Sequence, residues 1–345
     1  MQAELNKSEK VLVAKVLKRY GLSGPFLKLG KNTTGFVNKI FIVENKNQKF
    51  ALRQSAEQTS LSHLKFEVAV LDYLEKKSFK FTPRVLSNIA GEKATKVNGC
   101  YFILQNFLPG HWRANWNNLT TYNKAMLRSH FALLALFSKQ ISAFNFEKNK
   151  HRLGLLSYVG NAEKLLNKSI SALPASKGKS FMRKNQNLIL SFALETRQEM
   201  LQVGYDSLPK QIVHFDLHPG NLHFLKNRAV AMFDFDWVRY DNRLSDLAAA
   251  LCESCYYYHG SKAGYYRKDR IWAAINSYHQ AYGKSEFKPN KEIKLTKIAF
   301  KACLFFQILA CLDWYKEHYK EKRSDFILKF FIKVMTVNDF ERLFG

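Results

Sequence analysis

The 345-residue sequence predicts an α+β protein of two lobes, a small β-rich N-terminal lobe and a large helical C-terminal lobe. Up to about residue 107, helix-like and strand-like segments alternate along the chain, whereas beyond residue 110 apolar residues recur almost throughout at helical spacing. Between these halves, Leu108-Pro109-Gly110 is the strongest boundary signal in the chain. A chain of this length also exceeds what one hydrophobic core usually supports. We therefore expect domains at 1–107 and 108–345.

The N-terminal lobe is expected to contain two helices and four strands. Helical spacing predicts a first helix over 9–20, which Gly21 would end, and a second helix over 62–76. Short apolar runs bounded by turn residues predict the strands at 39–43, 49–53, 84–89 and 100–107.

The C-terminal lobe is expected to be helical apart from one β-like island. The apolar periodicity predicts helices at 122–145, 158–173, 180–203, 244–259, 269–283 and 291–320. The island consists of two short strand-like segments at 211–213 and 228–233.

The charge of the chain limits its partners without identifying them. Lys and Arg number 54 against 28 Asp and Glu, which gives a formal net charge of +26. Such a surplus is compatible with contact to nucleic acid, contact to a membrane surface, or an enzyme with a polyanionic substrate. A hydrophobic fraction of 47% excludes a disordered chain.

The chain is expected to be a soluble, cytoplasmic protein. Its five cysteines are an odd number without framework spacing, which favours a reducing compartment. The first residues contain no apolar signal segment. The longest apolar run, Ala302–Leu312, is interrupted by Gln307 and is far shorter than the ~20 residues of a membrane span. No transmembrane segment is therefore expected.

The β-like island carries the residues with the clearest chemistry. It reads His214-Phe215-Asp216-Leu217-His218-Pro219-Gly220-Asn221 and continues to Phe233-Asp234-Phe235-Asp236. The catalytic loop of kinases has the pattern H-x-D-L-x-x-x-N, followed by a strand that ends in an Asp beside Phe. Asp216 would then accept or orient the proton of a hydroxyl acceptor, and Asn221 and Asp234 would bind magnesium.

Two upstream segments occur in the order that phosphoryl transfer from ATP requires. Phe50-Ala51-Leu52-Arg53 lies on an expected strand where kinases have V-A-I-K, and Glu67 follows on the next helix. Together Arg53 and Glu67 would form the ion pair that positions the phosphates. The turn 33–38, which contains Gly35 and Asn38, stands where a phosphate-covering loop belongs.

The segment after Asp234 indicates a small acceptor. Protein kinases have a long activation segment there. In this chain a helix is expected to begin near Leu244, which leaves no room for a platform that docks a peptide. We therefore expect a small-molecule hydroxyl acceptor and no peptide substrate.

With these motifs the sequence resembles the aminoglycoside phosphotransferase / choline kinase-like family, which includes a homoserine kinase branch. The resemblance rests on the island motif and on Asp246-Leu247-Ala248, and extends over about 22–250. It implies a bilobal protein-kinase-like fold, ATP and Mg²⁺ as cofactors, and transfer to a small-molecule hydroxyl.

The resemblance also implies roles for individual residues. Asp216 corresponds to the catalytic base, and His214 and Asp246 to residues that support the catalytic loop. Asn221 and Asp234 correspond to the magnesium ligands. The residues that would contact the nucleotide are Gly35, Asn38, Arg53, Glu67, Gln105 and Phe107, the last two in a segment similar to the family's hinge.

The sequence departs from the family pattern at two positions. Many members have Gly where Phe215 stands, and the usual Lys is replaced by Arg53. The planar guanidinium still matches a carboxylate and a phosphate, although its geometry differs from that of an ammonium.

Two alternatives belong to other classes of protein. A metal-dependent hydrolase would use the alternating His214, Asp216 and His218, but Pro219-Gly220 breaks the strand that would align them. A nucleic-acid-binding or scaffold protein on a kinase-like fold would explain the charge, but the basic residues are spread along the chain and the catalytic motif is intact. The acceptor stays open among amino alcohols, sugars and antibiotics.

Overall fold

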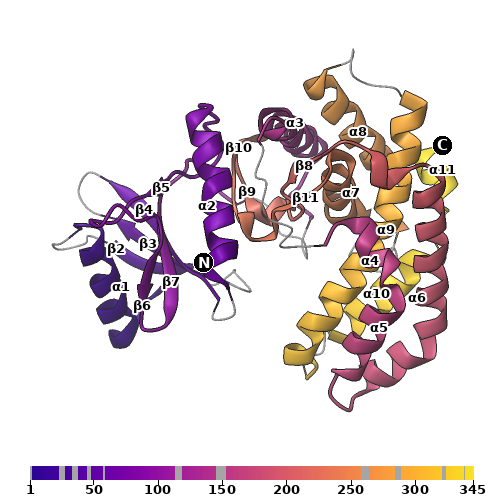
Figure 1. The fold of residues 1–345 in the computed structure, drawn as a ribbon, viewed down its shortest axis with the longest axis horizontal. Coiled ribbons are helices and arrows are strands. Elements are labelled where there is room, and N and C mark those ends of the chain that lie inside the picture. The colour runs from indigo at the N-terminus through magenta and orange to yellow at the C-terminus, as the bar shows by residue number, and fades with distance from the viewer. Residues whose placement is uncertain are drawn as a thin grey trace. The chain divides into compact units, whose positions relative to one another are not determined.

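The computed structural model describes residues 2–22, 28–32, 38–44, 48–56, 59–112, 119–144, 153–257, 265–283, 289–320, 324–337 and 339–345. The chain divides into two compact units. The first, which we call the β-rich unit, comprises Met1–Gly110 and Val230–Asp236. The second, the helical unit, comprises His111–Ala229 and Trp237–Gly345. The expected α+β class, with a small β-rich part and a larger helical part, is confirmed (Figure 1).

The β-rich unit is built on an antiparallel sheet of seven strands in the order β1-β2-β3-β4-β7-β5, with β6 paired to β7. Three of its strands, β1, β2 and β6, were not among the expected elements, and the expected strand 84–89 is reduced to two residues. The strands are β1 (Gln2–Glu4), β2 (Lys28–Asn32), β3 (Lys39–Glu44), β4 (Lys49–Gln54), β5 (Val85–Leu86), β6 (Thr95–Val97) and β7 (Cys100–Asn106).

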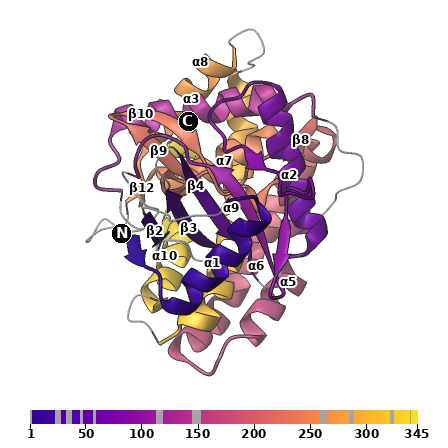
Figure 2. The ribbon, with the colours of Figure 1, turned by 90° about the vertical axis from the view of Figure 1, so that its left-hand side faces the viewer.

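Two helices cover opposite faces of this sheet, α1 (Lys7–Arg19) and α2 (Leu61–Lys76) (Figures 1 and 2). Asn6 and Glu9 form a capping box that starts α1. The buried side of α1 packs against alternate residues of the strands, among them Phe41, Leu52 and Leu104. Because side chains alternate along a strand, the residues between these positions face α2.

The helical unit contains nine described helices. α3 (Lys124–Ile141) packs against α8 (Lys268–Tyr282), and α7 (Arg243–Ser254) packs against α9 (Pro289–His318). Contrary to expectation, the helix expected at 158–173 is interrupted at Asn161, and the helix expected at 244–259 ends at Ser254. The remaining helices are α4 (Leu155–Gly160), α5 (Ala162–Ser171), α6 (Lys177–Gln202), α10 (Ser324–Val337) and α11 (Phe340–Phe344).

Three pairs of short strands and three 3-10 turns are described after residue 200, and most of them lie in or beside the β-like island. The strand pairs are β8 (Lys210–Val213) with β11 (Arg239–Asn242), β9 (Leu222–Leu225) with β10 (Arg228–Met232), and β12 (Tyr256–Tyr257) with β13 (Tyr265–Tyr266). The 3-10 turns are η1 (Tyr205–Ser207), η2 (Pro219–Asn221) and η3 (Phe235–Trp237).

The apolar run of the sequence lies in α9. The stretch Asn290–His318 is long and apolar enough to cross a membrane, with a mean hydropathy of 1.7 over its most apolar window. However, 78% of that window is buried inside the protein, as is typical of the central helix of a folded core.

Candidate active site

The segment His214–Asn221 of the helical unit is anchored by a carboxylate of α7. Asp246 is only 1% exposed. Its two oxygens accept the backbone N–H groups of His214, at 2.9 Å, and Phe215, at 2.8 Å. Burial raises the pKa of Asp246 to about 6, and the two N–H donors oppose that rise because they stabilise the ionised form. This double hydrogen bond fixes the start of the loop directly after β8.

The backbone of Phe215 has a φ of 67°, in the left-handed region that favours glycine. Its ring is buried, with the guanidinium carbon of Arg239 3.7 Å from the ring centroid. Arg239 is also buried and donates a hydrogen bond to the carbonyl oxygen of Leu153 at 3.0 Å. The aromatic contact therefore helps to hold Phe215 in a backbone conformation that favours glycine.

Asp216 is positioned by Asn221 at the other end of the loop. The Asn221 amide nitrogen donates to the Asp216 backbone carbonyl at 2.7 Å and to its carboxylate at 3.0 Å. Because the amide nitrogen is engaged, the side-chain oxygen of Asn221 is the atom it could offer to a cation. The half-buried Asp216 carboxylate is thus oriented from within its own loop.

In the β-rich unit, Arg53 and Glu67 form a buried ion pair. The Arg53 Nη2 atom lies 2.5 Å from Glu67 Oε2, and the side chains are 4% and 1% exposed. Burial raises the pKa of Glu67, and the adjacent guanidinium lowers it. The pair joins β4 to α2, the two elements on which the sequence places these residues.

Asp234 follows β10 and has an incompletely satisfied carboxylate. Its backbone φ is 61°, and its Oδ1 atom is buried without a hydrogen-bond partner. The Arg53 Nη1 atom lies 4.0 Å from this oxygen. Burial and the carboxylate of Asp236 raise the pKa of Asp234, while Arg53 lowers it. Such an oxygen is a suitable ligand for a divalent cation.

The sequence prediction gives Asp236 no role beyond its place in the motif. Asp236 nevertheless makes more polar contacts than Asp234. Its carboxylate accepts from the Asn38 amide at 3.3 Å and lies 3.5 Å from His63 Nε2. The same ring nitrogen lies 2.7 Å from the Asp236 carbonyl oxygen. Asn38 and His63 therefore hold the segment that carries Asp234 against β3 and α2.

Two further predicted nucleotide-binding residues, Gln105 and Phe107, are also in the β-rich unit. Gly35 lies outside the described residues. Gln105 of β7 pairs with Ala51, and Ile103 pairs with Arg53. Because directly paired residues share a face, Gln105 lies on the same side of the sheet as Arg53. Phe107 follows β7 by one residue, and Lys49 Nζ lies 4.2 Å from its ring centroid.

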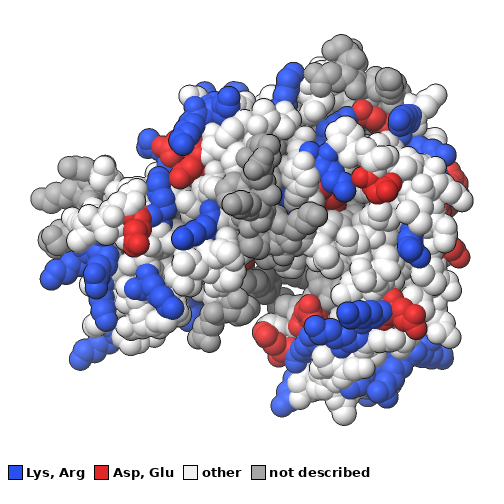
Figure 3. Space-filling view, viewed as in Figure 1, with Lys and Arg blue, Asp and Glu red and all other residues white. Residues whose placement is uncertain are grey.

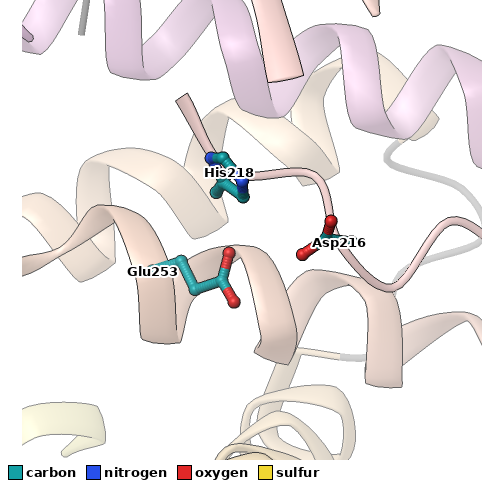
Figure 4. Close-up of side chains that lie close together, drawn as sticks. All are labelled: Asp216, His218 and Glu253. Carbon is teal, nitrogen blue, oxygen red and sulfur yellow. The ribbon is translucent and has the colours of Figure 1, made fainter. Parts of the chain in front are cut away.

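The sequence prediction missed an acid that lies beside the catalytic loop. Glu253 of α7 has a carboxylate oxygen within 4.8 Å of ligand atoms of Asp216 and His218 (Figure 4). It stands seven residues after Asp246 on α7, and residues two turns apart share a helix face. This spacing from Asp246 is the only sequence signal that could have placed Glu253 beside the loop.

The loop, its anchoring carboxylate and the buried Arg–Glu pair define a kinase-like phosphotransferase. Comparison with known proteins gives the same class. The model of the phosphotransferase enzyme family matches residues 31–274. The chain therefore belongs to the phosphotransferase enzyme family.

Among curated proteins, homoserine kinase of Zymomonas mobilis is 23% identical over 302 residues, which cover 88% of this chain and 86% of that protein. Among solved structures, Plasmodium vivax ethanolamine kinase has a TM-score of 0.69 at 13% identity, covering 99% of this chain and 91% of that one. An amicoumacin kinase in complex with AMP-PNP and Ca²⁺ has a TM-score of 0.68 at 14% identity, covering 97% and 99%.

These similarities confirm two of the expectations from the sequence. The fold is the bilobal kinase-like fold, and the protein is an enzyme of the small-molecule kinase type, with an alcohol group as acceptor.

Proposed function

We propose that this enzyme transfers the γ-phosphoryl group of ATP to a hydroxyl group of a small molecule of the amino alcohol, sugar or antibiotic type. The observation that carries the proposal is the orientation of Asp216 by Asn221, on a loop anchored by Asp246. Positioning is most of what phosphoryl transfer requires of a protein, since little covalent chemistry falls to its side chains.

In this proposal Asp216 receives the proton of the acceptor hydroxyl. The hydroxyl oxygen forms a bond to the γ-phosphorus while the bond from that phosphorus to the bridging oxygen of ADP breaks. The proton ends on the Asp216 carboxylate and ADP leaves with the electron pair of the broken bond. His214 and Asp246 keep the loop in the required conformation.

The oxygen atoms of Asn221 and Asp234 fit magnesium, which prefers hard oxygen ligands. The Oδ1 atom of Asp234, which has no hydrogen-bond partner, supports this assignment. Bound magnesium would neutralise charge on the phosphates. Arg53, held by Glu67, would contact the phosphates, and Gly35, Asn38, Gln105 and Phe107 would contribute to nucleotide binding. The complex of the amicoumacin kinase with AMP-PNP and Ca²⁺ supports a nucleotide and a divalent cation.

The domain assignment follows from these roles. We propose that 1–107 form an ATP-binding lobe and 108–345 a catalytic and substrate-binding lobe. All five cysteines are free, which supports a reducing compartment such as the cytoplasm.

The test is an ATP-consumption screen over amino alcohols, sugars, nucleosides and aminoglycosides. At least one class should stimulate ATP consumption in the presence of Mg²⁺. Asp216→Ala should reduce turnover by at least about 10³-fold while ATP still binds, because the proton acceptor alone is removed. Full activity of that variant would contradict the assignment.

A further inference from the structure

The guanidinium of Arg239 is enclosed in the helical unit next to the start of the catalytic loop. Strand β11 pairs with β8 so that Arg239 lies directly opposite Val213, the residue before His214. The side chain of Arg239 is only 1% exposed. Its Nη1 atom donates to the Leu153 carbonyl at 3.0 Å, and its Nε atom donates to the Trp237 carbonyl at 3.4 Å. These hydrogen bonds fix the orientation of the guanidinium plane.

Four described aromatic rings lie around this guanidinium. Its central carbon is 3.7 Å from the ring centroid of Phe215, 5.1 Å from that of Phe306, and 5.6 Å from those of Tyr158 and Trp237. A cation within about 6 Å of a ring centroid is attracted by the ring, most strongly where water is excluded. Phe215 has the closest ring, and Phe215 is also the loop residue with a left-handed φ of 67°.

The same guanidinium acts on the carboxylate that anchors the loop. Burial raises the pKa of Asp246 to about 6, whereas the backbone N–H groups of Phe215 and His214 and the charge of Arg239 lower it. A carboxylate accepts stronger hydrogen bonds when it is ionised. Arg239 therefore favours the form of Asp246 that best binds the two N–H groups, while it also holds the ring of Phe215.

We propose that Arg239 is a positioning residue for phosphoryl transfer, which holds Phe215 in the left-handed conformation that places Asp216 for the acceptor hydroxyl. This inference rests on the proposed function, because it takes Asp216 as the group that receives the hydroxyl proton. Asp216 directly follows Phe215, so a change of backbone conformation at Phe215 would move the Asp216 carboxylate away from the Asn221 amide. Glycine at position 215 would adopt the left-handed conformation without a ring contact. The need for Arg239 should then disappear.

The first variant is Arg239→Met, which keeps much of the side-chain length but removes the charge and the planar group. With Mg²⁺, ATP and the acceptor that gives the highest rate in the screen, kcat should fall about 10- to 100-fold, because a displacement of roughly 1 Å suffices for such a loss. The Kd for ATP should change by less than about twofold, because the loss is confined to the chemical step. Backbone hydrogen exchange of residues 214–221, measured by mass spectrometry without an acceptor, should become about tenfold faster.

The second comparison asks whether Arg239 acts through the ring of Phe215. Adding Arg239→Met to Phe215→Gly should change kcat by less than about threefold, because the two substitutions remove the same contact. Rates are expressed per ATP-binding molecule, so a loss of folded protein does not imitate a loss of kcat.

The matched control is Arg270→Met on α8. Arg270 is buried, its guanidinium carbon lies 5.0 Å from the Tyr122 ring centroid, and it donates to the carbonyl oxygens of Tyr122 and Ser254. This substitution removes the same kind of contacts away from the loop. It should lower the stability of the protein and leave unchanged both kcat per ATP-binding molecule and the hydrogen exchange of residues 214–221.

Wild-type kcat and wild-type loop exchange in Arg239→Met would overturn this inference and leave the kinase function standing. An undiminished effect of Arg239→Met in the Phe215→Gly enzyme would overturn it as well. If Arg239→Met does not fold, Arg239→Lys replaces it, since an ammonium cannot reproduce the planar fork. A lower kcat with unchanged ATP binding would then support the inference, and wild-type kcat would overturn it. Full activity of Asp216→Ala would instead refute the proposed function itself.

Discussion

Phe215 adopts a backbone conformation that is unfavourable for any residue with a side chain, at the start of the loop on which catalysis is proposed to depend. A left-handed φ costs a residue other than glycine roughly 1–2 kcal/mol. The buried ring offsets that cost through its contacts with Arg239 and with Phe306, whose ring centroid lies 5.0 Å away. Packing of the ring thus holds a backbone conformation that otherwise favours glycine.

Two substitutions at Phe215 separate these contributions. Both Phe215→Ala and Phe215→Gly should destabilise the protein, by about 3–5 kcal/mol for the lost ring. Phe215→Gly should be less destabilising than Phe215→Ala, by about 1 kcal/mol, because only alanine retains the backbone strain. Urea unfolding measures the difference. If Phe215→Ala were the more stable of the two, backbone strain at this position would be negligible.

At the scale of elements, the sequence predicts best where the amphipathic period is long. The helices α1, α2 and α8 lie close to their expected ranges because each repeats its apolar face over several turns. The strands β1 and β2 are not apparent in the sequence, since short edge strands carry few residues and little alternation. The break at Asn161 falls at Gly160-Asn161, a pair typical of helix ends, which a prediction based on apolar periodicity alone passes over.

The packing of α6 on α9 predicts that a Gly→Ala substitution in a helix lowers the stability of the protein instead of raising it. Gly178 of α6 is buried, and a Cβ atom added there would overlap the ring and hydroxyl of Tyr315 on α9. Gly→Ala inside a helix is normally stabilising by about 1 kcal/mol. Gly178→Ala should instead destabilise the protein by about 1–3 kcal/mol, because Tyr315 is itself buried and must shift.

Gly160→Ala is the matched control, since a Cβ atom there meets nothing within 4 Å. That variant should change the midpoint of thermal unfolding little or raise it. If the two substitutions changed the unfolding midpoint equally, Tyr315 of α9 would be able to shift away from residue 178 without a loss of stability.

The residues of the candidate site divide in the same way as the elements. Some can be predicted from the sequence, and others depend on tertiary packing. Asp216, Asn221 and Asp234 can be proposed from the sequence because fixed spacings along one loop and hairpin connect them. The ion pair of Arg53 and Glu67 is readable from a strand followed by a helix. His63 and Glu253 are not, because each reaches its partners from a helix that is remote in sequence from the loop it contacts.

At the scale of the whole molecule, the charge of +26 is spread out. On the face shown in Figure 3, Lys and Arg side chains are distributed over both units, with acidic side chains among them. Some of the basic groups are paired, as Lys301 is with Glu199 and Lys124 with Asp269. On this face the distribution differs from the continuous basic stripe typical of a nucleic-acid-binding protein.

We therefore expect only weak, sequence-independent binding of RNA. Two RNAs of equal length and unrelated sequence should bind with the same affinity, which should fall roughly tenfold between 50 and 200 mM salt because few phosphates are contacted. Fluorescence anisotropy measures both quantities. Nanomolar affinity for one of the two RNAs at physiological salt would instead favour the nucleic-acid-binding alternative.

The segment Val230–Asp236 has a consequence for how the protein is made. It belongs to the β-rich unit, where the backbone N–H of Met232 donates to the Phe81 carbonyl at 2.8 Å, although helical-unit residues precede and follow it in the chain. On the ribosome, domains generally fold as their residues emerge. Here the β-rich unit cannot be completed until residue 236 of 345 has been synthesised. For much of its synthesis the nascent chain therefore carries a β-rich unit that lacks the segment Val230–Asp236, and the residues that contact this segment, such as Phe81, stay exposed to chaperones in that period.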